Sequence, residues 1–220
     1  MWGASRQLEG EEQAIRQWLR ASPFVHVDES IFRVDGHRQW IWVFVTEEDL
    51  LLVIRNSRAR GVVEEVLGKD YAGKIICDGW KAYLGWVLQR CWAHLLRYGK
   101  EGAEKITEGK RLYAELCVLY EKMTRDLETA SGRARARRLR KGTRVLETLL
   151  KKFGGGEDAA VQKVVTYLQN GMAWWLTFLR TPGMEATDNR GERGLKEAIV
   201  IRKIVGTLRN ERGPTRSRVC

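Results

Sequence analysis

The first third of the chain alternates between short apolar runs and turns, a pattern that predicts a β-sheet. Runs rich in β-branched and aromatic residues indicate strands at 24–28, 40–45, 50–54, 73–78 and 87–91. The first three follow one another closely, so we expect them to form an antiparallel meander. Apolar residues at helical spacing within 58–67 predict a helical crossover before the fourth strand.

Helical spacing dominates the rest of the chain. A short amphipathic helix is predicted at 11–20, and from 92 to 180 charged and apolar stretches repeat at helical spacing. A further helix is expected over 188–201, with Asp188 or Asn189 able to cap its start. The order β-β-β-α-β followed by helices predicts an α/β, RNase H-like fold, with a mixed central sheet and a large all-helical insertion before the last helix.

These elements divide the chain into five segments. We expect a helical lead-in over 1–21, the first part of the core over 22–91, a helical insertion over 92–183, the last part of the core over 184–213 and a basic tail over 214–220. The core is therefore expected to be assembled from two stretches that flank the insertion.

Composition places the chain among folded proteins of a reducing compartment. Its 220 residues are 44% hydrophobic, enough for a sizeable core. The four cysteines lack paired C-x2-C spacing, which argues against a disulfide scaffold or a structural zinc module. No apolar run approaches the ~18 residues that span a membrane, and the first residues lack the apolar core of a secretory signal. We expect a soluble cytoplasmic protein without a membrane partner.

Positive charge is concentrated in two stretches. The formal net charge is +11; residues 131–152 carry nine Lys/Arg against one acidic residue, and residues 190–220 carry nine against three. Such stretches are the expected footprint of phosphate-backbone binding, although a solvated helix face and a basic tail would show the same charge. The residues that we expect to contact DNA are Arg137, Arg138, Arg140, Arg193, Arg202 and Lys203.

Two aspartates each follow an apolar strand. Asp28 comes after residues 24–27 and Asp78 after residues 75–77, so both carboxylates are expected at strand ends of the central sheet. Ligand sites form at strand ends in open α/β sheets, and adjacent carboxylates repel unless a cation lies between them. For either aspartate taken singly, the pattern favours a turn residue.

Glu192 is the third candidate carboxylate. It shares one helical face with Leu195 and Ile199, the face expected to pack toward the sheet. An ion pair with Arg193 or Lys196 is the alternative. Three acidic oxygen donors suit Mg²⁺ or Mn²⁺, and two such ions support in-line displacement at phosphorus without a side-chain nucleophile.

Several longer motifs resemble the transposases of the insertion sequence 66 family. Residues 25–30, Val-His-Val-Asp-Glu-Ser, resemble its first catalytic motif, and 34–44 its glycine turn and aromatic strand. Residues 77–83, Cys-Asp-Gly-Trp-Lys-Ala-Tyr, resemble the second motif, followed by 89–97. Residues 187–195, Thr-Asp-Asn-Arg-Gly-Glu-Arg-Gly-Leu, resemble the third. The motifs occur in the family's order across about residues 22–213, which makes a chance match unlikely compared with one short pattern.

The resemblance implies an RNase H-like fold and a metal-binding catalytic triad of Asp28, Asp78 and Glu192. It also implies two Mg²⁺ or Mn²⁺ ions, transposon ends and target DNA as partners, a homo-oligomer in the active complex, and association with the nucleoid of a prokaryotic cell. Three residues depart from the family's pattern: Ser30 replaces Thr, Asp188 replaces Asn and Gly191 replaces Ala. None removes a triad carboxylate, although Asp188 adds negative charge near the metals.

Other polar and aromatic residues have supporting roles in this interpretation. The pair Cys91 and His94 resembles a feature that follows the second aspartate in several such transposases; a structural or DNA-contacting role is favoured over zinc, which needs further ligands. Asn189 is expected beside the third carboxylate. Trp174 and Trp175 can stack on an unpaired base, but at least one is expected in the core.

The leading hypothesis is the catalytic domain of a DDE-type transposase, which cleaves DNA strands and transfers them. The alternatives are a related nuclease that only hydrolyses, a catalytically silent, truncated transposon remnant that only binds DNA, and a basic RNA-binding protein. Because little chain flanks Asp28 and Glu192, we expect a partial transposase that does not complete transposition by itself.

Overall fold

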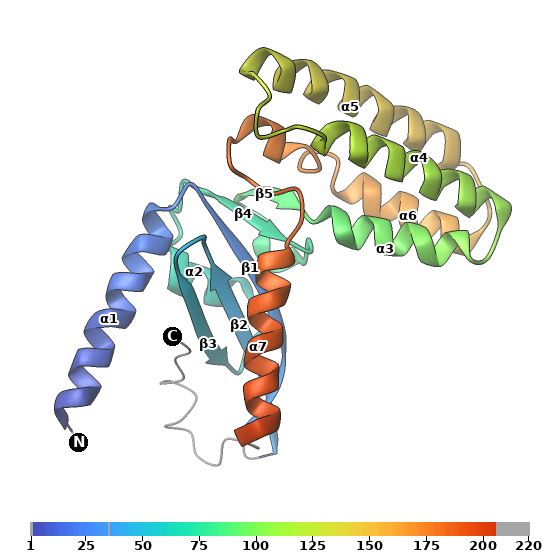
Figure 1. Cartoon of the computed structure of the whole chain (residues 1–220). Helices are drawn as coiled ribbons and strands as arrows, with labels where there is room; N and C mark the ends of the chain where they lie inside the picture. The colour runs from blue at the N-terminus through green and yellow to red at the C-terminus, as the bar shows by residue number, and fades with distance from the viewer. Residues whose placement is uncertain (1, 35, 206–220) are drawn as a thin grey trace. The chain divides into compact units, whose positions relative to one another are not determined.

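The computed structural model describes residues 2–34 and 36–205, with side chains over 9–34 and 36–200, and divides them into two compact units. The first unit runs to residue 88 and resumes at 188; the second spans 89–187. Figure 1 labels the elements of both. Among the described residues, no helix combines the length and apolar character needed to cross a membrane.

The first unit is a mixed α/β structure. Its elements are α1 (Trp2–Ala21), β1 (Phe24–Val34), β2 (His37–Val45), β3 (Leu50–Arg55), α2 (Arg60–Leu67), β4 (Lys74–Cys77), the 3-10 turn η1 (Lys81–Tyr83), β5 (Val87–Arg90), at whose middle the unit ends, and α7 (Asn189–Val205). The sheet order is β3-β2-β1-β4-β5. The predicted meander is confirmed, because β1 pairs antiparallel with β2 and β2 with β3.

The strand β4 lies parallel to β1 after the predicted helical crossover. The register pairs Phe24 with Lys74, Val25 with Ile75 and His26 with Ile76. This pairing explains why the chain needs α2 between β3 and β4, since parallel neighbours cannot be joined by a tight turn. The first helix and first strand are both longer than the sequence pattern predicted, reaching Trp2–Ala21 and Phe24–Val34.

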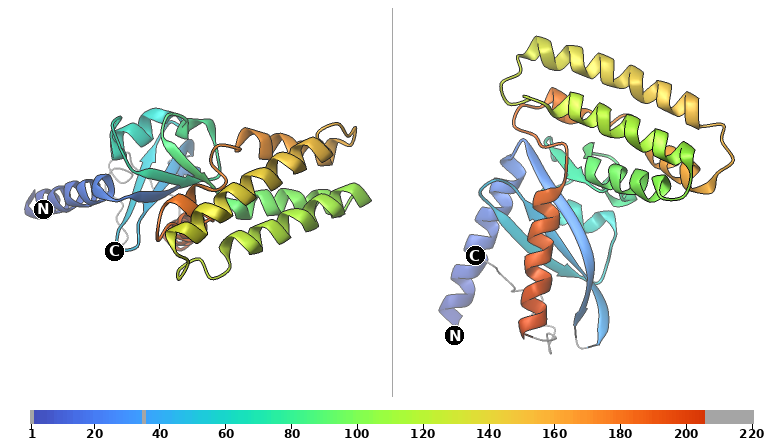
Figure 2. Two further views of the ribbon diagram at one scale, coloured as in Figure 1. Left: turned by 90° about the horizontal axis from the view of Figure 1, so that it is seen from above. Right: turned by 45° about the vertical axis from the view of Figure 1, so that its right-hand side comes forward.

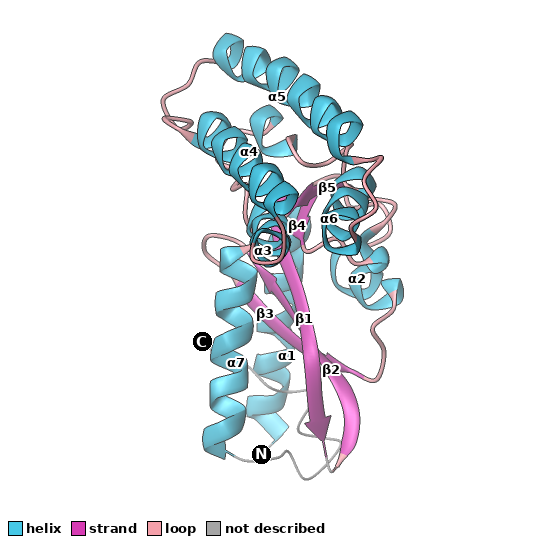
Figure 3. Cartoon of the chain, turned by 90° about the vertical axis from the view of Figure 1, so that its right-hand side faces the viewer, coloured by secondary structure: helices cyan, strands magenta, loops and turns pink. Residues whose placement is uncertain are grey.

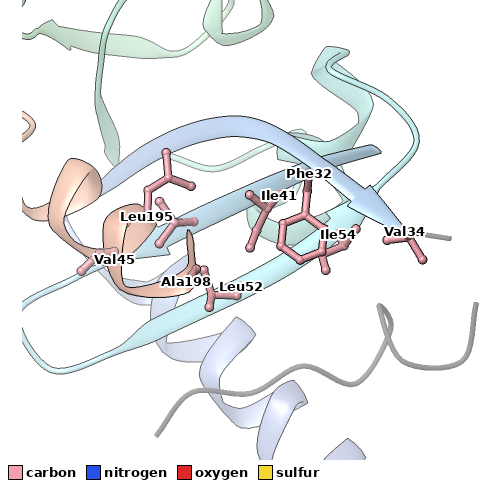
Figure 4. Packing of buried hydrophobic residues seen from close by; sticks show 9 residues of the cluster. Phe32, Val34, Ile41, Val45, Leu52, Ile54, Leu195 and Ala198 are labelled. Carbon is pink, nitrogen blue, oxygen red and sulfur yellow. The ribbon is translucent and has the colours of Figure 1, made fainter. Parts of the chain in front are cut away.

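Helix α7 packs on one face of the sheet. Apolar side chains at alternate positions of β1, β2 and β3 point toward the helix, and Leu195 and Ala198 of the helix pack against these side chains (Figure 4). The cluster consists of Phe32, Val34, Ile41, Val43, Val45, Leu52, Ile54, Leu195 and Ala198. Glycine at 194 permits the close approach, since a Cβ there would be in tight contact with Leu50 at 3.0 Å and Val43 at 3.1 Å. The packing fixes where the start of α7 lies relative to β1.

The other face of the sheet carries a second layer of buried side chains. Trp42 and Phe44 stack at 6.5 Å between ring centroids, and the buried Tyr83 meets Trp42 edge-on at 6.2 Å. Helix α2 adds Val62, Val63, Val66 and Leu67 to the core. The helix α1 is joined to α2 by Arg20, which donates to the carbonyl oxygen of Val66 at 2.8 Å.

The second unit is almost wholly helical (Figures 2 and 3). It contains α3 (Trp92–Ala103), α4 (Thr107–Thr124), α5 (Gly132–Phe153), α6 (Ala159–Asn170) and the 3-10 turn η2 (Thr177–Arg180). Helix α3 packs on α4 and α6, and α5 packs on the same two helices. Leu112, Leu116 and Leu119 are buried along α4 at the helical spacing that the sequence pattern showed.

A buried polar connection holds the second unit together near its tryptophans. The fully buried Gln89 donates to the carbonyl oxygen of Trp175 at 3.2 Å and accepts from the backbone of Phe178 at 2.9 Å. The Trp92 indole also donates to the Trp175 carbonyl oxygen, at 2.6 Å. Trp175 is therefore core, as expected for at least one residue of its pair, and Trp174 is half-buried.

Candidate active site

Asp28 and Asp78 occupy equivalent levels on neighbouring strands. The parallel register of β1 and β4 is described up to the pair His26 and Ile76. Carrying this register two residues further sets Asp28 opposite Asp78, just after β4 ends at Cys77. The sheet topology thus brings together two carboxylates that are 50 residues apart in the chain.

Backbone amides orient both aspartates. Oδ1 of Asp28 accepts a hydrogen bond from the Glu29 amide at 2.9 Å. Oδ1 of Asp78 accepts one from the Trp80 amide at 2.7 Å, across a turn whose middle residue, Gly79, has φ 94°. The turn interpretation of Asp78 and its interpretation as a site residue therefore describe the same structure, because the turn presents the carboxylate beside Asp28.

Glu192 lies in the first turn of α7, three residues before the buried Leu195. Its backbone amide donates to the Asp188 carbonyl oxygen at 3.0 Å, so Asp188 is the N-cap residue directly before the helix. Glu192 itself is half-buried, whereas the neighbouring Arg193 is exposed. The apolar face of α7 thus holds Glu192 toward the sheet.

The three carboxylates interact electrostatically. Burial raises the pKa of Asp28 from 3.8 to about 6, and the charges of Asp78 and Glu192 add to the rise. The Glu29 amide and the Arg58 guanidinium oppose it. The charges of Asp78 and Glu192 therefore both act on Asp28 within the first unit. No group of three or more His, Cys, Asp or Glu side chains within the described residues is arranged closely enough to hold a metal ion.

A buried hydrogen bond links the strand of Asp28 to the helix of Glu192. Nδ1 of His26 lies 2.8 Å from Oδ1 of Asp188, and both side chains are completely buried. Hydrogen bonds in such surroundings are strong, since water does not compete for the partners. Asp188, which the sequence analysis expected to add negative charge near the metals, is thus one partner of this buried hydrogen bond.

Asp188 also leaves no room for a side chain at position 191. A Cβ on Gly191 would lie 2.6 Å from Oδ1 of Asp188, closer than real Cβ contacts. Two of the three departures from the family's pattern, at 188 and 191, are therefore in direct contact. Ser30, the third, is half-buried on β1 and no feature of the structure explains it.

Glu29 is a second buried carboxylate beside the triad. Burial raises its pKa from 4.5 to about 7, and the Asp78 charge raises it further, while hydrogen bonds from Tyr83 and Arg58 oppose the shift. The Arg58 Nε donates to Oε1 of Glu29 at 2.7 Å, and the buried Tyr83 hydroxyl donates to Oε2. Sequence reasoning missed Glu29 and Arg58, because a carboxylate on an otherwise apolar strand face was the only signal and Arg58 gave none.

The basic residues predicted on α5 divide into two groups. Arg137 and Arg140 are exposed and, with Lys141 and Arg144, line one shallow hollow on the surface of the second unit. Arg138 instead donates to the carbonyl oxygens of Met123 and Arg125, at 3.4 and 2.5 Å. It thereby satisfies the C-terminal end of α4. Arg138 thus differs from Arg137 and Arg140 in being bound to the end of α4, and its role as a DNA contact stays a prediction.

The remaining predicted residues have simpler surroundings. Asn189 and Arg193 are exposed, while the side chains of Arg202 and Lys203 lie outside the described residues. Cys91 is fully buried at the start of α3, and His94 is half-buried one turn later. These positions leave the roles of Cys91, His94 and Asn189 as predictions.

Comparison with known proteins gives one match. A family model described as "Transposase IS66 family" matches residues 1–216, nearly the whole chain. No curated protein and no solved structure matches the chain.

Proposed function

Because the chain belongs to the IS66 family of transposases, we propose that it is a DDE-type catalytic domain that cleaves DNA and transfers the cut strand. The single observation that carries the proposal is the electrostatic coupling of Asp28 to both Asp78 and Glu192. Three separate parts of the chain supply these carboxylates, and a cation bound by them would offset their repulsion. The fold that we propose is RNase H-like, with the second unit as its helical insertion.

The chemistry of the donors fits Mg²⁺ or Mn²⁺. Both are hard cations that prefer carboxylate and water ligands and leave positions open for substrate phosphate. Asp28, Asp78 and Glu192 would hold the ions. When bound, two such ions activate the attacking hydroxyl and stabilise the leaving oxygen in an in-line displacement at phosphorus.

The protein's own residues prepare this site. The Glu29 amide holds one oxygen of Asp28 and the Trp80 amide holds one oxygen of Asp78, so both carboxylates are oriented by the backbone. The His26 and Asp188 pair holds the start of α7 against β1. Such support matters because catalytic groups lose activity when they shift by an ångström or less.

We further propose that the exposed cations of α5, together with Arg193, Arg202 and Lys203, bind the DNA backbone, and that the protein acts as a homo-oligomer on two transposon ends. Arg137, Arg140 and Arg144 extend along one side of α5, while Leu146 and Leu149 are buried on its other side. A row of this kind contacts successive phosphates without reading the sequence.

The test compares two glutamates on one helix. Purified protein is incubated with supercoiled plasmid and Mg²⁺ or Mn²⁺, and nicking is measured for the wild type, Glu192→Gln and the control Glu197→Gln, since Glu197 is exposed on α7. We expect Glu192→Gln and Asp78→Asn to lose cleavage by 100-fold or more, on the order of 3 kcal/mol, while the control retains it. Equal cleavage by Glu192→Gln and wild type would rule out the triad.

A second assay separates a transposase from a nuclease. A labelled DNA that carries the sequence flanking the gene is supplied with an unlabelled target plasmid, and transfer of label to the plasmid is measured. Label joined to the target indicates strand transfer, whereas cleavage without joining would indicate a nuclease that only hydrolyses DNA.

A further inference from the structure

A cluster of alternating cations and aromatic rings lies on the first unit next to the triad. The cation–aromatic cluster consists of Arg38, Trp40, Arg58, Trp80 and Lys81. Arg38 lies over the Trp40 ring at 4.9 Å, and Arg58 lies over both Trp40 and Trp80, at 4.9 and 4.1 Å. The Lys81 ammonium lies 5.5 Å from the centre of the Trp80 ring. Four contacts thus join five side chains from β2, the loop after β3 and the turn after β4.

The cluster is accessible and carries excess positive charge. Arg38 and Lys81 are exposed, and both tryptophans are half-buried. Arg58 is the one member paired with an acid, Glu29, at 2.6 Å. Neither Arg38 nor Lys81 forms an ion pair within the part of the chain that the structure describes. Two exposed cations without acidic partners attract a polyanion, and cation–π contacts with the rings do not neutralise their charge.

The Trp80 ring is held in a fixed orientation. The Trp80 indole donates to the carbonyl oxygen of Arg58 at 3.2 Å, and the Trp80 amide is bound to Asp78. Arg58 is fixed in turn by its two contacts with Glu29. The side-chain rotation of Trp80 is therefore already restricted before a ligand stacks on its ring, which lowers the entropic cost of binding.

We propose that the cation–aromatic cluster binds unpaired nucleotides of a DNA strand beside the triad. Aromatic rings stack on bases of any sequence, but only where the base faces are not already stacked in a duplex, and flanking cations contact the phosphates. Trp80 and Trp40 provide the rings, while Arg38 and Lys81 provide the cations. The choice of DNA as the nucleic acid rests on the proposed function; the stacking geometry does not.

The location of the cluster gives this site a place in the reaction. Trp80 is two residues from Asp78, and the Arg58 charge acts on Asp28. Nucleotides held on the rings therefore lie beside the carboxylates, where a strand freed by cleavage must be kept from leaving before it is joined. The proposal adds a single-strand site to the duplex-binding surface proposed on α5.

The test measures binding without chemistry. A labelled single-stranded oligothymidylate of about 12 nucleotides and a duplex of the same length are titrated with protein in EDTA, and fluorescence anisotropy and quenching of protein tryptophan are recorded. Trp80→Ala is expected to weaken single-strand binding about tenfold or more and to reduce the quenching, while duplex binding changes less than twofold. Trp18→Ala is the matched control, because Trp18 is an exposed tryptophan, at 57%, outside the cluster.

Two further variants keep the test decisive. Trp80→Phe retains a ring but not the donor to Arg58, and it should keep most of the affinity. The double variant Arg38→Ala with Lys81→Ala alters only exposed side chains and should reduce the salt dependence of single-strand binding by about 1.4, the slope for two phosphate contacts. Unchanged single-strand binding in both Trp80→Ala and the double variant, or an equal loss for single strand and duplex, would overturn the proposal. A wild-type protein that binds in this way but cleaves nothing with metal contradicts the proposed function instead.

Discussion

Nδ1 of His26 and Oδ1 of Asp188 lie 2.8 Å apart with both side chains completely buried, although 162 residues separate them. The contact joins the strand that carries Asp28 to the helix that carries Glu192. Removal of one partner takes this hydrogen bond away from the other buried polar group. Such a loss destabilises a protein far more than replacement of both partners by apolar side chains does.

We therefore expect His26→Ala to lower the free energy of unfolding by about 3 kcal/mol, measured by urea denaturation. His37→Ala is the control, since His37 is exposed at the start of β2 and should change stability little. Asp188→Asn, which restores the residue usual in the family, retains an oxygen acceptor and should cost much less than Asp188→Ala. Equal losses for Asn and Ala at 188 would mean that the hydrogen bond contributes nothing.

Steric contact at the start of α7 provides the second prediction. Gly191→Ala places a methyl group 2.6 Å from Oδ1 of Asp188. We expect a loss of about 1–3 kcal/mol of stability from overpacking. Gly61→Ala on α2 is the matched control, because a Cβ there meets nothing within 4 Å. That change should stabilise the protein by roughly 0.5–1 kcal/mol, as alanine favours helix more than glycine does. The sign of the two effects, read from thermal unfolding, tests the packing.

The raised pKa values of Asp28 and Glu29 predict how stability depends on pH without metal. Both values, about 6 and about 7, lie above those of unfolded chains. The native state therefore binds protons at these two groups more tightly, so their contribution to stability is fully present below about pH 4 and is lost as pH rises through 6 to 7. The loss is at most about 3 kcal/mol per group.

The measurement is the unfolding midpoint in EDTA between pH 5 and 8, for the wild type and Glu29→Gln. The variant keeps a neutral side chain at all pH values and should flatten the decline. Addition of Mg²⁺ should raise the midpoint more at pH 8 than at pH 5, because protons compete with the cation for Asp28. A midpoint that rises with pH in the metal-free wild type would contradict the assignment of these two carboxylates as buried and repelled by the Asp78 charge.

The α5 surface predicts salt-dependent duplex binding. Reversal of charge at Arg137, Arg140 and Arg144 should weaken binding and reduce the slope of log K against log salt by about 2.7, the value for three phosphate contacts. The control reverses three exposed cations elsewhere in the second unit, Lys100, Lys110 and Arg111, for the same change in net charge. The α5 surface is only a solvated helix face if both triple variants lower the slope equally.

Arg138 is expected to behave differently from its neighbours on α5. Its guanidinium binds carbonyl oxygens at the end of α4, so Arg138→Glu should lower the unfolding midpoint of the protein. Arg137→Glu should leave that midpoint nearly unchanged, because the side chain is exposed. Thermal unfolding of the two single variants distinguishes these roles.

Local patterns in the sequence determined the elements of this protein. The apolar run before Asp28, the short apolar strand before Asp78 and the face that Glu192 shares with Leu195 each depend on residues close in the chain, and side-chain period is a local property. The meander, the parallel crossover and the burial of Leu195 follow from them. The helix boundary did not follow from the apolar pattern, since α1 extends over Trp2–Ala21 and the pattern marked only 11–20.

Only the tertiary structure decided which polar groups meet. His26 and Asp188 give no periodic signal, and their hydrogen bond exists because α7 packs across β1. Arg138 looks like Arg137 in the sequence, yet one binds the end of a neighbouring helix and the other faces solvent. The reason is physical: a buried polar group must find a partner when water is removed, and the partner is whatever the packed backbone brings within reach.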